Sequence, residues 1–145
     1  MDAYEAVSLP EPSSLVGQKC FSVPEANRAL VLVRRIVTDI VSDYRRLCTL
    51  HEEYQELEAR GNLLKAEETR QQYVQVTDRL SELRDELEEL GCELKDYEAG
   101  LVDFPAMRQG REVFLCWRLG EESVSHWHEL DSGFRGRQRL DDQMH

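Results

Sequence analysis

The chain has 145 residues, the size of one domain, and a formal net charge of −11 from 29 acidic and 18 basic side chains. Residues 52–98 carry 15 acidic and 6 basic side chains, whereas residues 1–51 and 99–140 each carry six of either sign. Because an acidic surface repels phosphate backbones, we expect no nucleic acid partner. No apolar run approaches the ~20 residues that a membrane span needs. With no such run and no CxxC spacing among the four cysteines, we expect a cytoplasmic protein with reduced thiols and no membrane partner.

Residues 1–18 are rich in proline, serine and glycine and show no periodicity, so we expect a flexible N-terminal tail. A single domain is expected to follow over residues 19–140, with a short tail at 141–145. The first helix should begin after Ser22, because Glu25 stands three residues on as in a capping box.

Two successive helices are predicted over residues 23–91. Their seam positions recur every three and four residues, as in a heptad repeat. On the first helix they are Leu30, Val33, Val37, Ile40, Tyr44, Leu47, His51 and Tyr54; after a turn at Gly61 they resume with Ala66, Thr69, Tyr73, Val76, Leu80, Leu83, Leu87, Leu90 and Leu94. Folding the second helix back pairs Ile40 with Leu83, and the same antiparallel register satisfies every other rung.

An antiparallel β-meander is predicted over residues 92–130. Its clearest strand spans residues 112–119, which are rich in branched and aromatic side chains, and residues 124–130 form the return strand. The predicted fold class is therefore α+β: a long antiparallel two-helix coiled-coil hairpin followed by a small β-meander packed at its base. The first half of the first helix is apolar beyond the seam, which suits cover by this sheet.

The register between the predicted strands at residues 112–119 and 124–130 decides whether a metal site can form. A half-buried hairpin should match its apolar faces, which puts His126 and His128 beside Trp117 and Leu115 and turns Cys116 to the other face. A Cys-His-His site would require a slip of one residue. We therefore expect no bound metal and no cofactor, a buried thiol, and two histidines that are hydrogen-bonded or exposed; His126 and His128 remain the candidate ligands.

Arginines gather near the end of the chain, at Arg135, Arg137 and Arg139, with Arg108 and Arg111 nearby in the meander. They fit either an anion or an acidic partner, or pairs with local carboxylates. Both alternatives stay open.

Several blocks of the chain resemble a known family. They are the opening Phe21-Ser22-Val23-Pro24-Glu25-Ala26-Asn27, then Lys95-Asp96, Gly100-Leu101-Val102-Asp103-Phe104-Pro105, Gly110-Arg111-Glu112-Val113, Cys116-Trp117-Arg118-Leu119-Gly120-Glu121, Trp127-His128 and Gly133-Phe134-x-Gly136-Arg137. Together they are similar to the prokaryotic family called domain of unknown function 2203, over about residues 20–140. The resemblance implies a bacterial cytoplasmic protein, and it brings no known activity.

Two functions are compatible with these features. The favoured one is a non-catalytic interaction or scaffold protein that presents an acidic coiled-coil arm to a protein partner. It is expected to form a homodimer, because Phe114 and Cys116 give the central strand a second apolar face that a twin subunit would cover.

The alternative is a small enzyme or a metal- or ligand-binding protein. Its pocket would lie around Asp103, Arg111, Trp117, His126 and His128, and Arg137 is a further candidate for ligand binding.

Overall fold

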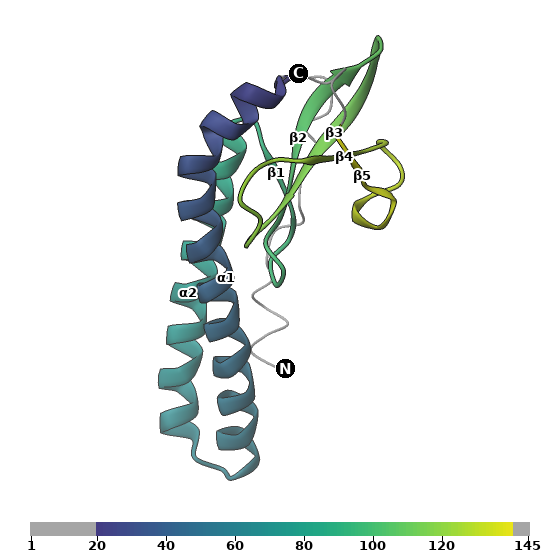
Figure 1. Ribbon diagram of the computed structural model, residues 1–145. Helices are drawn as coiled ribbons and strands as arrows, with labels where there is room; N and C mark the ends of the chain where they lie inside the picture. Colours follow the sequence, from purple (N-terminus) through teal and green to yellow (C-terminus); the bar gives the residue numbers. More distant parts are fainter. Residues whose placement is uncertain (1–19, 141–145) are drawn as a thin grey trace.

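The computed structural model describes residues 20–140, so both predicted tails, at residues 1–18 and 141–145, lie outside the described part. Two helices precede five strands and a short 3-10 helix. They are α1 (Val23–Ala59), α2 (Leu63–Glu89), β1 (Glu93–Asp96), β2 (Leu101–Arg108), β3 (Arg111–Arg118), β4 (His126–His128), η1 (Phe134–Gly136) and β5 (Gln138–Arg139). The strands form one antiparallel sheet in sequence order, beside one end of the helical hairpin (Figure 1). The predicted α+β architecture is confirmed, and β5 extends the sheet beyond residue 130.

Local side chains set the helix boundaries. The Ser22 side chain accepts a hydrogen bond from the Glu25 backbone N–H (3.2 Å), and the Glu25 carboxylate accepts one from the Ser22 N–H (3.0 Å), which is the predicted capping box. At the turn between the helices Gly61 has a φ of +76°, a conformation that favours glycine, and Asn62 caps α2.

The seam of the hairpin is buried for most of its length. Ile40, Val37 and Leu80 are each 0% exposed. Polar contacts between the helices agree with antiparallel pairing: Arg79 Nε lies 3.3 Å from Asp43 Oδ2, and Arg46 donates to Gln72 (3.3 Å). The last predicted rung differs, because Leu94 lies in β1, where it pairs with Val102.

The inner face of the sheet joins the core of the hairpin. Phe104 pairs with Leu115 across β2 and β3, and its ring meets that of Phe21 edge-on at a centroid distance of 5.2 Å. The other buried side chains of this face are Leu94, Val102, Ala106, Val113, Trp117 and Trp127. Gly100 brings the backbone close to α1, because a Cβ there would lie 2.9 Å from Val37.

The predicted register of the β3–β4 hairpin is wrong by one residue. Cys116 pairs with His126 and Phe114 with His128, so both histidines share a face with Cys116 and not with Trp117. The reason lies in β4, which has only three residues and turns Trp127 to the core. The alternation therefore does not extend to Val124 and Leu130, whose faces guided the prediction.

The outer face of the sheet is covered in this chain. Phe114 is 4% exposed and Cys116 is 1% exposed. The premise for a twin subunit over this face is therefore wrong. Exposed apolar residues lie elsewhere, at Val31 (71%) and Leu32 (44%) on α1.

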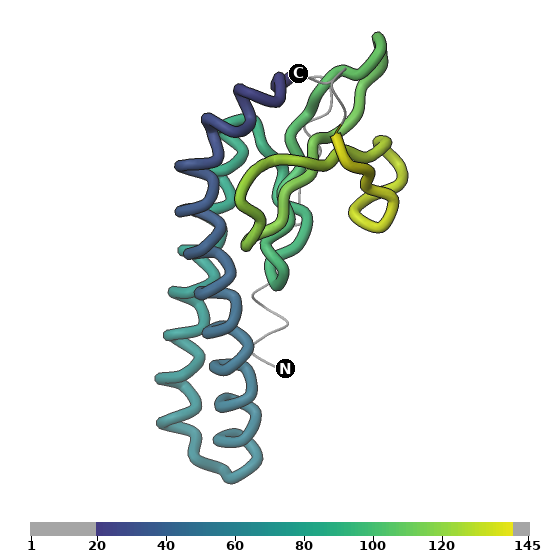
Figure 2. The backbone as a smooth tube through the Cα atoms, in the orientation of Figure 1, coloured from purple at the N-terminus to yellow at the C-terminus, as the bar shows by residue number. Residues whose placement is uncertain are grey.

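The helical hairpin extends well past the sheet (Figure 2). Stacked rings of Tyr44 and Tyr97, 5.7 Å apart, join α1 to the segment between β1 and β2. Most of the acidic excess lies near the sheet: residues 78–98 hold nine acidic and three basic side chains, whereas residues 52–77 hold six and three. Neither helix in the described part combines the length and apolar character that crossing a membrane requires.

Candidate functional site

A row of polar side chains crosses the outer face of the sheet. The strand register places Glu93 opposite Asp103, Asp103 opposite Cys116, and Cys116 opposite His126. His128 lies two residues from His126 on the same face. Four of these residues are almost fully buried, with exposed fractions of 2% for Glu93, Asp103 and His128 and 1% for Cys116. Buried polar groups require hydrogen-bond partners, so the loss of any contact in this row would lower the stability of the fold.

Asp103 and His128 form a buried pair. His128 Nε2 lies 2.9 Å from Asp103 Oδ1, and Nδ1 lies 2.7 Å from the carbonyl oxygen of Glu129. Because a carbonyl oxygen only accepts, Nδ1 carries a proton and donates it. Burial by itself lowers the pKa of His128, but the hydrogen bond and charge of Asp103, together with the Glu129 carbonyl, raise it above its usual value.

Cys116 completes a compact group with this pair. One ligand-type atom from each of Asp103, Cys116 and His128 lies within 4.8 Å of the other two. Burial and the nearby Asp103 carboxylate raise the pKa of Cys116 to about 12, although Arg137 acts in the opposite direction. At neutral pH the residue is therefore a thiol and a poor nucleophile.

Beside this group, Arg137 and Glu121 form a bidentate ion pair with N–O distances of 3.0 and 2.7 Å. The Phe134 ring stacks on Arg137 at 4.3 Å, and the Arg118 N–H also donates to Glu121 (2.8 Å). Burial alone would raise the pKa of Glu121, but these donors hold it below its usual value. His126 lies 3.9 Å from Glu121, and burial and Arg137 lower its pKa.

The proposed five-residue pocket does not assemble as predicted. Asp103 and His128 are in contact, whereas Trp117 lies on the opposite face, in the core. Arg111 pairs with Glu129, and His126 faces Glu121. The side chains that sequence reasoning missed are Cys116, as a neighbour of Asp103, and Glu121. The resemblance blocks contain both, and they were the signal available.

Local pairing also accounts for much of the arginine cluster. Arg137 is bound to Glu121, Arg111 to Glu129, and Arg108 lies 4.4 Å above the Trp127 ring. Arg135 and Arg139 are exposed. This arrangement agrees with the second alternative, pairs with local carboxylates.

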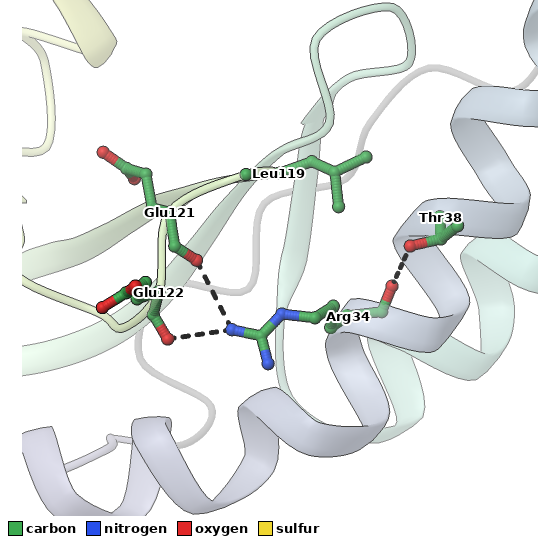
Figure 3. Close-up of a pocket in the computed structure, with 6 residues that line it drawn as sticks. Arg34, Thr38, Leu119, Glu121 and Glu122 are labelled. Carbon is green, nitrogen blue, oxygen red and sulfur yellow. Dashed lines mark hydrogen bonds between the residues drawn. The ribbon is translucent and has the colours of Figure 1, made fainter.

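A cleft of about 440 Å³ lies on the other side of the sheet, between α1 and the turn after β3 (Figure 3). Arg34 enters it from α1 and donates to the carbonyl oxygens of Glu121 (3.4 Å) and Glu122 (2.9 Å). Trp117 Nε1 donates to the same Glu121 carbonyl (3.0 Å). These hydrogen bonds anchor the turn to α1 and to β3. The polar groups of the cleft are therefore used in holding the structure together.

The polar row can therefore hold charge in a closed environment, and Asp103, Cys116 and His128 offer oxygen, sulfur and nitrogen donors together.

No curated protein and no solved structure matches the chain. A family model, described as an uncharacterized conserved protein (DUF2203), matches residues 19–140. That match spans most of the chain, including every residue of the polar row, and the chain belongs to the DUF2203 family.

Proposed function

We propose that the protein is a non-catalytic interaction protein of the bacterial cytoplasm, which presents its helical arm to a protein partner. The observation that carries this proposal is the arm itself, the part of the hairpin that extends beyond the sheet (Figure 1). Its two helices bury their seam against each other and leave their outer faces free in the described chain.

The tip of the arm supports this assignment. Leu63 and Leu64 follow the turn between the helices and are 70% and 79% exposed. Large apolar side chains exposed side by side favour contact with another molecule, because their burial removes apolar surface from water. Residues 52–77 around this tip hold six acidic and three basic side chains, a smaller excess than beside the sheet but one that still favours a partner with basic groups.

The closed polar row argues against catalysis. Asp103, Cys116 and His128 are at most 2% exposed, so a substrate cannot reach them without movement of the strands. The raised pKa of Cys116, about 12, keeps the free residue in its thiol form near neutral pH, which disfavours nucleophilic attack. The second candidate function, a metal- or ligand-binding protein, is favoured by the grouping of these same three residues.

Engagement of the arm can be tested in living cells with a photo-crosslinking residue at position 64. The matched control carries the same residue at Met107, which is 48% exposed at the end of β2. We expect a discrete crosslinked species from position 64 and none from position 107. Absence of any species from position 64, or the same species from both positions, would contradict the proposal.

We further propose that two copies associate through the base of the hairpin. Because Phe114 is already covered, this part of the proposal depends on Val31 and Leu32, exposed by 71% and 44% on α1. Sedimentation equilibrium at about 30 µM would populate any dimer with a dissociation constant near 1 µM. We expect a dimer that the double change Val31→Glu and Leu32→Glu dissociates; a wild-type monomer would rule it out.

A further inference from the structure

We propose that Asp103, Cys116 and His128 bind one divalent transition metal ion, with zinc as the best match to the donors. The three residues come from the adjacent strands β2, β3 and β4, so the ion would join these strands on the outer face of the sheet. This inference develops the second candidate function, metal binding, and does not depend on the proposed interaction function of the arm.

The donor set suits zinc. Zinc in proteins takes nitrogen from histidine, sulfur from cysteine and oxygen from carboxylates, most often in tetrahedral arrangements. Ideal tetrahedral geometry puts neighbouring donors about 3.3–3.6 Å apart. The donor atoms here lie within 4.8 Å of one another, with 2.9 Å between His128 Nε2 and Asp103 Oδ1. Side-chain shifts of about 1 Å therefore bring all three to bonding distance.

The orientation of His128 matches that of a ligand. Its Nδ1 donates to the Glu129 carbonyl, which directs Nε2 toward the other two donors. Metal-bound histidines usually have such a backbone or carboxylate partner on the second nitrogen, because it fixes the tautomer and the ring plane. Rotation of Asp103 by a small angle would let the ion take the place of the direct contact.

Charge balance favours a divalent ion in this buried position. Two negative ligands, the Asp103 carboxylate and the Cys116 thiolate, together with a neutral His128, give a complex of zero net charge. Binding requires loss of the thiol proton and of any proton on Nε2, and the ion itself drives both losses. The Arg137 guanidinium acts on the Cys116 sulfur, and its charge is already matched by the two hydrogen bonds to Glu121.

A fourth ligand is not supplied by the described donors in this group. The fourth position would be held by a water molecule, an arrangement otherwise typical of catalytic zinc sites. Because the residues are buried, we expect the ion to act on the stability of the sheet and not on a substrate.

The test uses the full chain in a background where the exposed Cys20 and Cys48 are replaced by serine. Metal is removed with a chelator, and cobalt(II) or zinc is then titrated in. We expect one equivalent to bind, with the near-ultraviolet charge-transfer band of a cobalt–thiolate bond. The matched pair is Cys116→Ser and Cys92→Ser, since both cysteines are buried (1% and 0% exposed).

Cys116→Ser should abolish the band and weaken zinc binding by more than the 10–100-fold that loss of an outer-shell partner produces. Cys92→Ser should keep both the cobalt–thiolate band and the zinc affinity. X-ray absorption on the zinc form of the background protein gives a readout that depends on no ligand variant: one sulfur near ~2.3 Å with nitrogen and oxygen near ~2.0–2.1 Å. A first shell without sulfur, equal behaviour of the two serine variants, or less than one tightly bound equivalent would overturn the proposal. None of these results bears on the crosslinking test of the arm.

Discussion

The buried pair of Asp103 and His128 provides the sharpest test of the polar row. Both side chains are only 3% exposed and lie 2.9 Å apart. In His128→Ala, the Asp103 carboxylate would remain in the sheet without its main partner, and breaking a buried pair in this way typically lowers the free energy of unfolding by about 3–5 kcal/mol. The change should therefore destabilise the metal-free protein far more than an ordinary surface substitution does.

Replacing the other partner gives a graded series. Asp103→Ala leaves Nε2 of His128 unsatisfied, with an expected loss of about 1–3 kcal/mol. In Asp103→Asn the amide nitrogen can donate to Nε2, so we expect a loss nearer 1 kcal/mol. The double alanine variant should lose less than the sum of the two single changes, because each single change removes the same contact.

Urea unfolding of the chelator-treated proteins measures these differences. With a slope of about 2 kcal/mol per molar urea, a loss of 3–5 kcal/mol moves the midpoint down by roughly 1.5–2.5 M. A His128→Ala protein within about 0.5 kcal/mol of wild type would refute the reasoning, since it would mean that the carboxylate is not held in a closed environment. Additive single changes would refute the pairing itself.

Cysteines replacing Ile40 and Leu83, in a chain without its native cysteines, should form a disulfide within one chain, and a pair shifted by two residues should not; equal crosslinking would refute the helix register. Glu121→Gln should lower the free energy of unfolding by about 1–2 kcal/mol near neutral pH, because it breaks the bidentate pair. The folded pKa of Glu121 is lowered, so its contribution is present above the unfolded pKa and disappears as the pH falls through the folded one. Urea midpoints that differ equally at about pH 7 and about pH 3 would contradict it. Gly100→Ala should lose about 2 kcal/mol or more, since a Cβ would lie 2.9 Å from core atoms at a φ of +71°. Gly61→Ala, with a φ of +76° and open space around it, should lose about 1 kcal/mol, so equal losses would show that packing at Gly100 is loose.

The helical part of the fold was readable from local chemistry. Heptad spacing, the capping box at Ser22 and the glycine turn at Gly61 act over a few residues, so they predict the hairpin without knowledge of the rest of the chain. The chain order of strands likewise predicted an antiparallel meander. These signals depend on period and on turn residues, which the sequence states directly.

The candidate site was only partly predictable. Asp103 and His128 were named as candidates, but their contact joins β2 to β4 across the whole width of β3. The residue type of Glu121 did not mark it as a site residue, because its role depends on the ion pair with Arg137, which follows η1. When two residues come into contact only through the order of the strands, no local sequence pattern around either residue predicts the contact.

The sequence by itself determined the two helices, their turn, the antiparallel order of the sheet and the residue types available for a polar site. Only the tertiary structure decided which face of the sheet Cys116 and His128 share. That choice depends on a shift of one residue in a strand of three, and burial of Trp127 against the core sets it. Because side chains alternate along a strand, this single shift moves both histidines from the apolar face to the polar row, where Asp103 and Cys116 lie.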